Sequence, residues 1–126
     1  MDRIRIEVKA SRAVDANLDA PLYVKALSSD SQRDFWMNFQ QVKPDCCDVF
    51  VWIAVWRDVI RYWVLSSNEV KTNQHYSQGQ HRGNVGEGQL HVRHDNIQEF
   101  ETYRVQPNEL ERAIYSAYER QNAIQS

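Results

Sequence analysis

Glu7 and Lys9 are the residues whose types and spacing point most directly to chemistry. They lie two positions apart in a segment that alternates charged with aliphatic side chains, so on a β-strand both project from the same face. A carboxylate can hold a hard divalent cation, and an ammonium group beside it can stabilise the charge that develops in phosphoryl chemistry. The same spacing is common on the solvated face of an edge strand, which is the alternative interpretation.

A second candidate region is the glycine-rich segment at residues 71–94. It contains all four glycines, all four histidines, three Lys or Arg residues and one Glu, a net charge of +2. Residues 1–12 also carry +2, so the positive charge of a chain with net charge -2 is concentrated in two segments. If these segments share a face, they predict contact with a phosphate backbone, whereas the alternative is a solvated loop without a partner. The candidates for DNA contact are Arg5, Lys71, His81 and Arg82.

Local patterns predict the elements that position these residues. The alternation over residues 3–9 predicts a first strand, and residues 22–27 form a possible short strand after a polar loop. Apolar side chains from Phe35 to Val42 recur at helical spacing after Ser28–Asp30, which can cap a helix, and before a proline. The first third of the chain is therefore predicted as strand, short strand and helix.

The rest of the chain contains a clear hairpin. Residues 48–56 are almost all β-branched or aromatic, which predicts a central strand buried on both faces, and a tight turn leads into a second strand over residues 59–65. A short helical turn follows, then a long mobile loop at residues 72–89 and a strand at residues 89–94. A helix with a capping box formed by Asn108 and Glu111 runs to about residue 122. The predicted class is α/β (α+β), with a small mixed central sheet of about four to five strands flanked by helices.

Length and composition narrow the class of protein further. A chain of 126 residues predicts a single domain over residues 1–126, and a pI near 6.1 excludes a uniformly basic nucleic-acid coat. The longest apolar run is much shorter than the roughly 20 residues that cross a bilayer, and no signal peptide is apparent, which predicts a cytoplasmic protein without a membrane partner. The adjacent Cys46 and Cys47 are interpreted as reduced, packing thiols.

The order of these features resembles the distal part of small PD-(D/E)XK nuclease-like proteins, which have the restriction-endonuclease-like fold. The similar segments span roughly residues 3–105 and are the Ile-Glu-Val-Lys-Ala-Ser strand, the Phe35-Trp36 pair before a helix, the buried Asp-Val-Phe-Val-Trp strand, the hairpin through Val70 and the polar loop. The resemblance implies a chain reduced or truncated at its N-terminus, because the strand and helix that precede the catalytic motif in that superfamily have no counterpart here.

The resemblance also implies roles for particular residues. Glu7 matches the second metal-binding acid and would ligate Mg²⁺, Lys9 matches the catalytic lysine that positions water, and loop residues such as Arg82 would hold phosphates of DNA. No residue matches the first acid. Asp48, Asp58 and Glu87 are the alternatives that the fold could bring toward Glu7.

A first strand without its usual neighbour exposes a row of backbone donors and acceptors, which predicts a homodimer. Two functions are therefore expected from the sequence. One is metal-dependent hydrolysis of DNA phosphodiesters by a restriction-endonuclease-like domain, which has an incomplete site. The other is a non-enzymatic, homo-oligomeric binding or assembly domain that kept the sheet, with a mobile-element protein as one alternative source.

Overall fold

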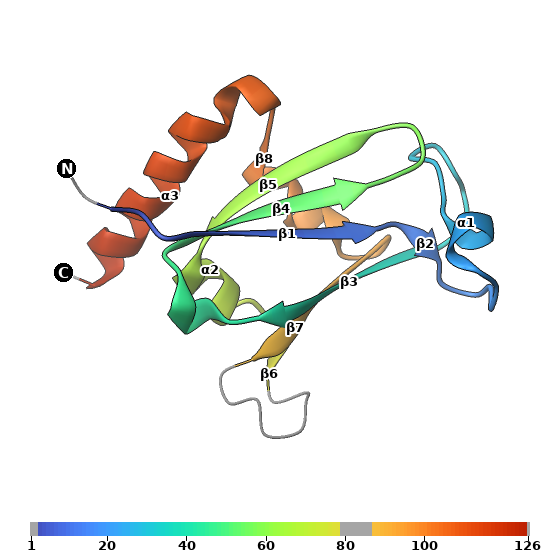
Figure 1. Cartoon of the computed structure of the whole chain (residues 1–126), viewed down its shortest axis with the longest axis horizontal. Coiled ribbons are helices and arrows are strands. Elements are labelled where there is room, and N and C mark those ends of the chain that lie inside the picture. The colour runs from blue at the N-terminus through green and yellow to red at the C-terminus, as the bar shows by residue number, and fades with distance from the viewer. Residues whose placement is uncertain (1–2, 79–86, 126) are drawn as a thin grey trace.

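The computed structural model describes residues 3–78 and 87–125, and their strands form two four-stranded sheets (Figure 1). The first sheet has the order β1-β4-β5-β8, with β1 at Ile6–Arg12, β4 at Val49–Val55, β5 at Ile60–Ser66 and β8 at Arg104–Val105. β1 is parallel to β4, and the other neighbours are antiparallel. The second sheet is antiparallel and has the order β2-β3-β7-β6, with β2 at Val14–Asp15, β3 at Phe35–Val42, β7 at Gly88–Arg93 and β6 at Tyr76–Gln78.

One continuous stretch of chain joins the two sheets at a corner. β1 ends at Arg12 and β2 begins at Val14, so only Ala13 separates a strand of the first sheet from a strand of the second. The backbone N–H of Ala13 donates to the carbonyl of Val55 at 2.9 Å, and its carbonyl accepts from the N–H of Leu27 at 3.0 Å. A strand that changes sheets in this way closes one side of a sandwich.

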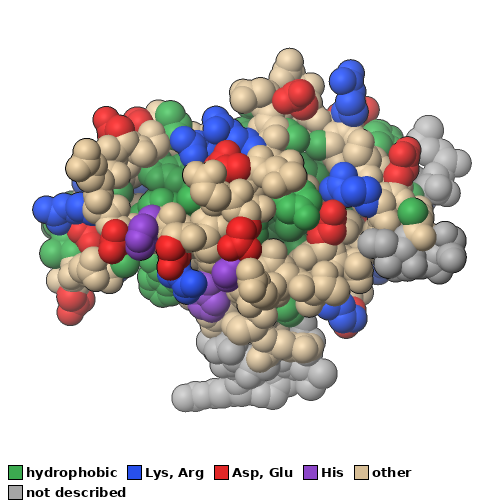
Figure 2. Space-filling view, turned by 180° about the vertical axis from the view of Figure 1, so that it is seen from behind, with side chains coloured by type: hydrophobic (Ala, Val, Ile, Leu, Met, Phe, Trp, Pro, Cys, Tyr) green, Lys and Arg blue, Asp and Glu red, His purple; other side chains and the backbone are tan. Residues whose placement is uncertain are grey.

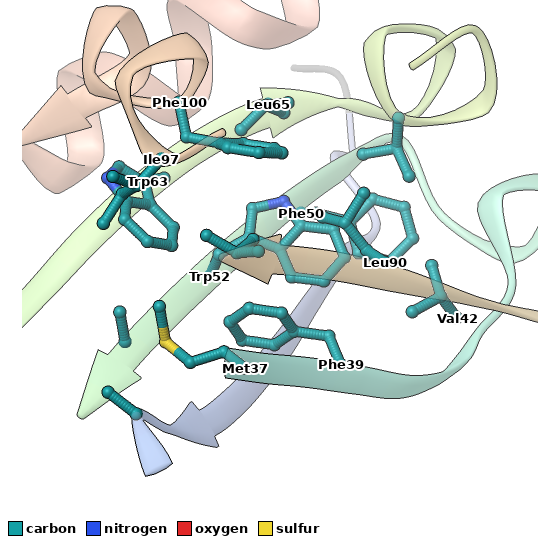
Figure 3. Close-up of a cluster of buried hydrophobic side chains, with 14 of the residues drawn as sticks. Met37, Phe39, Val42, Phe50, Trp52, Trp63, Leu65, Leu90, Ile97 and Phe100 are labelled. Carbon is teal, nitrogen blue, oxygen red and sulfur yellow. The ribbon is translucent and has the colours of Figure 1, made fainter. Parts of the chain in front are cut away.

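The main core fills the space between the two sheets (Figure 3). Trp52 of β4 meets Phe39 of β3 edge to face, with ring centroids 5.0 Å apart, and stacks on Phe50 at 4.9 Å. Trp63 of β5 and Phe100 close the far end of the core, at 5.8 Å from each other. Large aromatic side chains give a small sandwich most of its buried apolar area.

Three helices complete the structure. α3 at Leu110–Gln125 packs on the outer face of the first sheet, where Ala117 is buried against Val49, Val51 and Val64. α2 at Ser67–Lys71 begins with a capping box formed by Ser66 and Glu69. Short helical pieces lie at α1, Leu22–Lys25, and in the 3-10 turns Pro44–Cys46, Ile97–Glu99, Glu101–Tyr103 and Pro107–Glu109.

Much of the predicted element order is confirmed. The α+β class, the hairpin of β4 and β5, the short α2, the strand β7 and the helix α3 all appear, and β4 is central and buried as expected. The capping box before α3 is formed by Gln106 and Glu109, two residues earlier than the predicted Asn108 and Glu111, at the start of a 3-10 turn that leads into α3. Cys46 and Cys47 are both free, although only Cys47 is buried. The predicted loop at residues 72–89 is wrong where the structure describes it, because Tyr76–Gln78 form β6 and β7 begins at Gly88; residues 79–86 lie outside the described residues.

Two other predicted elements are wrong. The segment Phe35–Val42 is the strand β3, because Met37 and Phe39 point into the core with a period of two and a bulge then places Val42 inward instead of Gln41. Gln41 has φ of 56°, and the resulting phase shift makes the apolar spacing look helical in the sequence. Residues 22–25 form a helical turn, not a strand. Since β3 is a strand, it organises a second sheet where the sequence predicted one sheet covered by helices.

Candidate functional site

β1 is an edge strand with one free side. It pairs with β4, and no other described strand hydrogen-bonds to it. The carbonyl of Arg5 accepts from the N–H of Asp48 and the N–H of Ala13 donates to Val55, so the odd-numbered residues direct their backbone groups toward β4. Because these groups alternate along a strand, Ile6, Val8 and Ala10 direct theirs to the free edge.

Glu7 and Lys9 do share one face of β1, as the sequence predicted. Their registered partners on β4 are Phe50 and Trp52, so this face turns toward the second sheet and the core between the sheets. Lys9 Nζ lies 3.6 Å from Glu7 Oε1, and the Lys9 side chain is only 18% exposed, against 50% for Glu7. The interpretation of these residues as a solvated face is therefore wrong for Lys9, whose side chain is mostly buried.

The opposite, aliphatic face of β1 is exposed to solvent. Ile6 is 44% exposed and Val8 is 56% exposed, although both are apolar. α3 covers β4 and β5 on this side of the sheet. It leaves a hollow of about 380 Å³ between its own residues Ile114 and Tyr115 and the beginning of β1. An edge strand with an exposed apolar face is a surface that soluble proteins normally cover or protect with charge.

Arg5 and Lys71, two of the residues predicted to contact DNA, line one polar pocket of about 230 Å³. The Arg5 N–H donates to Asp48 Oδ2 at 2.8 Å and its guanidinium lies 3.3 Å from Asp48 Oδ1, an interaction that raises the pKa of Arg5. Lys71 Nζ lies 2.9 Å from Asp45 Oδ1. Each cation thus already has a carboxylate partner, and a phosphate would have to compete with it.

The buried thiol of Cys47 lies on the same pocket. Its Sγ is 3.3 Å from Ser67 Oγ, which itself donates to the carbonyl of Cys47 at 2.6 Å. Burial raises the pKa of the Cys47 thiol, the hydrogen bond with Ser67 lowers it, and the charges of Glu7 and Asp48 raise it further. A thiol held protonated is a packing group and a poor nucleophile.

The two other residues predicted to contact DNA, His81 and Arg82, lie outside the described residues. Figure 2 shows the face opposite to that of Figure 1, and there the coloured Lys and Arg side chains are interspersed with Asp and Glu. A DNA backbone needs a surface on which cations are clustered. The described residues on this face do not form such a continuous basic surface.

Asp48 is the candidate first acid that the fold brings next to β1. It immediately precedes β4 and lies on the same face as Phe50, the partner of Glu7, but its carboxylate is engaged by Arg5. Asp58 lies in the turn after β4, where it accepts from the backbone N–H and hydroxyl of Ser29, and Glu87 is buried near Lys43. Of the three alternatives for the first acid, Asp48 is therefore the one that lies beside the strand of Glu7.

The described residues fit the Mg²⁺ that the resemblance implies only poorly. Glu7 lies beside the Lys9 ammonium and Asp48 beside the Arg5 guanidinium, so each carboxylate already neutralises a cation. In the described ranges, no group of three or more His, Cys, Asp and Glu side chains is placed to hold a metal ion. Hard cations are usually held by several oxygen ligands, and Mg²⁺ binding stays a prediction.

One hollow was not foreseen from the sequence. It has a volume of about 540 Å³, lies at the corner between β1, β2, α1 and β3, and is lined by Arg12, Lys25 and Trp36 among others. These residues are distant in the chain and belong partly to the elements whose secondary structure was wrongly predicted, so no local pattern could have assembled them.

Comparison of the chain with protein-family models, with curated proteins and with solved structures finds no match. Among the described residues, no helix is both long enough and apolar enough to cross a membrane. The nuclease resemblance is neither supported nor replaced by a relative, so the functional argument rests on the geometry of β1 and its surroundings.

Proposed function

We propose that this chain is a non-enzymatic assembly domain that forms a two-fold homodimer through the free edge of β1. The observation that carries the proposal is the exposure of Ile6 and Val8 on an edge strand whose outer backbone groups have no partner strand among the described residues. Antiparallel pairing of two β1 strands would satisfy these groups and create one continuous sheet across the dimer.

The alternation along β1 favours one register. Val8 directs its backbone groups to the free edge, so two copies can pair with Val8 opposite the partner's Val8 and Ile6 opposite the partner's Ala10. In this register Glu7 faces the partner's Lys9, and Lys9 faces the partner's Glu7. These are non-hydrogen-bonded pairs, in which opposing side chains approach most closely. The charge pattern of β1 is thus complementary to itself.

The helix α3 extends the same surface. A two-fold axis through the Val8 pair, perpendicular to the sheet, keeps both copies of α3 on one face of the joined sheet. Tyr115 is exposed beside the hollow that Ile4, Ile6 and Ile114 also line. A stable interface usually buries about 800 Å² on each partner, more than five paired strand residues supply, so α3 is expected to contribute.

The test is sedimentation equilibrium of the wild type and of Val8→Lys. Lysine at position 8 would place two like charges at the two-fold axis, so the variant should be monomeric at concentrations where the wild type is dimeric. Ile60→Lys is the matched control, because Ile60 is 54% exposed on β5, away from the β1 edge. A wild type that stays monomeric at about 100 μM, or equal dissociation of the two variants, would refute the proposal.

Nuclease activity is a second candidate, and one observation favours it. Asp48 immediately precedes β4, the strand that pairs with the strand of Glu7, and lies on the same face, where the nuclease resemblance calls for a first acid. The test is cleavage of supercoiled and single-stranded DNA in Mg²⁺ and Mn²⁺ by the wild type, Lys9→Ala and Asp48→Asn. Metal-dependent nicking that both variants lose would support a working site, whereas no nicking, or nicking that the variants retain, would exclude it.

A further inference from the structure

The hollow at the corner of the two sheets, called here the corner pocket, combines an apolar wall with two cations. It is lined by Val14, Leu22, Trp36 and Val55 on its apolar side and by Arg12 and Lys25 among its polar residues. Its volume of about 540 Å³ lies in the range of pockets that bind small molecules. The corner pocket is a different surface from the polar pocket of Arg5 and Lys71.

The indole of Trp36 supplies a rigid apolar surface in the corner pocket. Trp36 lies on β3 with its side chain on the outer face of the second sheet, where it stacks on His91 with ring planes 11° apart and centroids separated by 6.4 Å. Burial, followed by the charges of Arg93 and His75, lowers the pKa of His91, which favours the uncharged ring. Leu22 of α1 is also exposed at this site. Planar aromatic ligands pack well against such a preoriented ring.

The charges of the corner pocket are unbalanced. Among the described residues, no Asp or Glu lines it, and neither Arg12 nor Lys25 forms an ion pair. In contrast, Arg5 and Lys71 in the polar pocket are each paired with an aspartate. Two cations without carboxylates, at the rim of an apolar hollow, attract an anion that carries an apolar group.

We propose that the corner pocket binds a small aromatic carboxylate, with the ring against Trp36 and the carboxylate between Arg12 and Lys25. Ala10 lines the pocket and is also the last residue that pairs in the proposed dimer, whereas Arg12, Lys25 and Trp36, which would hold the ligand, lie outside that pairing. Binding is therefore a property of each single chain and does not depend on the proposed function.

The test uses 2-naphthoate as the probe and 2-naphthalenemethanol as its uncharged counterpart, in ¹H–¹⁵N correlation spectra of the full chain. Naphthoate should shift the amide signals of Arg12 and Lys25 and the indole signal of Trp36 with one saturable site. Loss of the carboxylate should weaken binding roughly ten-fold, and Arg12→Gln or Lys25→Gln should each weaken naphthoate binding roughly five-fold.

Arg112→Gln is the matched control, since Arg112 is an exposed cation on α3 that lines a different hollow. It should leave naphthoate affinity unchanged, and so should Val8→Lys, which separates failure of this site from failure of the dimer. The proposal is overturned if naphthoate shifts signals all over the surface, if the uncharged probe binds equally well, if the Arg12 and Lys25 variants bind like Arg112→Gln, or if Val8→Lys abolishes binding.

Discussion

Reversal of the charges on β1 tests both the proposed dimer and its register. In that register each Glu7 faces the partner's Lys9, and the two-fold axis repeats the pair. Glu7→Lys converts both attractions into repulsions, and Lys9→Glu does the same with the opposite sign. The double variant, Glu7→Lys with Lys9→Glu, restores two attractive pairs and preserves the net charge of the chain.

The expected magnitude follows from the exposure of the two side chains. Glu7 is 50% exposed and Lys9 is 18% exposed, so each cross-strand pair is worth about 0.5–1 kcal/mol after solvent screening. Replacing two attractions by two repulsions of similar size changes the free energy of dimerisation by at least about 2 kcal/mol, a roughly 30-fold increase in the dissociation constant. The contact between positions 7 and 9 within one chain changes equally in monomer and dimer and cancels.

The assay is sedimentation equilibrium of the wild type, the two single variants and the double variant at low and high salt. Each single variant should dissociate, and the double variant should return to within about three-fold of the wild type. The difference should shrink near 1 M salt, where screening acts over about 3 Å. Equal dissociation of the single and double variants would refute the register, and unchanged association of the single variants would refute the use of this edge.

Three further predictions concern stability. Partial burial acts to raise the pKa of Glu69, but hydrogen bonds from Arg120 and from the backbone of Ser66 hold it below its ordinary value. The contribution of Glu69 to the free energy of unfolding is therefore present above pH 4.5 and declines as the pH falls below that value. In urea unfolding measured against pH, Glu69→Gln should show a shallower loss of stability in acid than the wild type, and an unchanged slope would contradict this. The buried indole N–H of Trp63 has no acceptor among the described residues. In urea titrations, Trp63→Phe should therefore lower the free energy of unfolding by only about 1–2 kcal/mol, against about 3–5 kcal/mol for Trp63→Ala. Equal losses in the two variants would show that the N–H is satisfied. Gln41 occupies the left-handed region with φ of 56°. Gln41→Gly should therefore stabilise the fold by up to about 1 kcal/mol, and Gln41→Val should destabilise it, both measured by the shift in Tm. The reverse order would contradict the bulge at this position.

Elements with strong local signals were predictable from the sequence. The hairpin of β4 and β5 has two apolar runs separated by a polar turn, and Ser66 with Glu69 forms a capping box within four residues. β3 was not predictable in the same way, because the bulge at Gln41 shifts the alternation by one residue. Ser29, a residue in the predicted helix cap, instead donates to the Asp58 carboxylate, a partner 29 positions away.

The candidate site was likewise predictable from the sequence only in part. The alternation of β1 was sufficient to place Glu7 and Lys9 side by side, since side chains two residues apart on a strand share a face. The sequence could not show which face of β1 turns toward the core, because β4 beside it is buried on both faces and offers aromatic partners on one and valines on the other.

The sequence by itself determined the class, the strands β1, β4, β5 and β7, and the pairing of charges along β1, because these depend on neighbours within a few residues. Only the tertiary structure decided that Ile6 and Val8 lie exposed at a free edge, that Asp48 engages Arg5, and that Arg12 and Lys25 share a pocket with Trp36. Such relationships arise when a strand passes from one sheet to another and distant segments meet, which no local periodicity encodes.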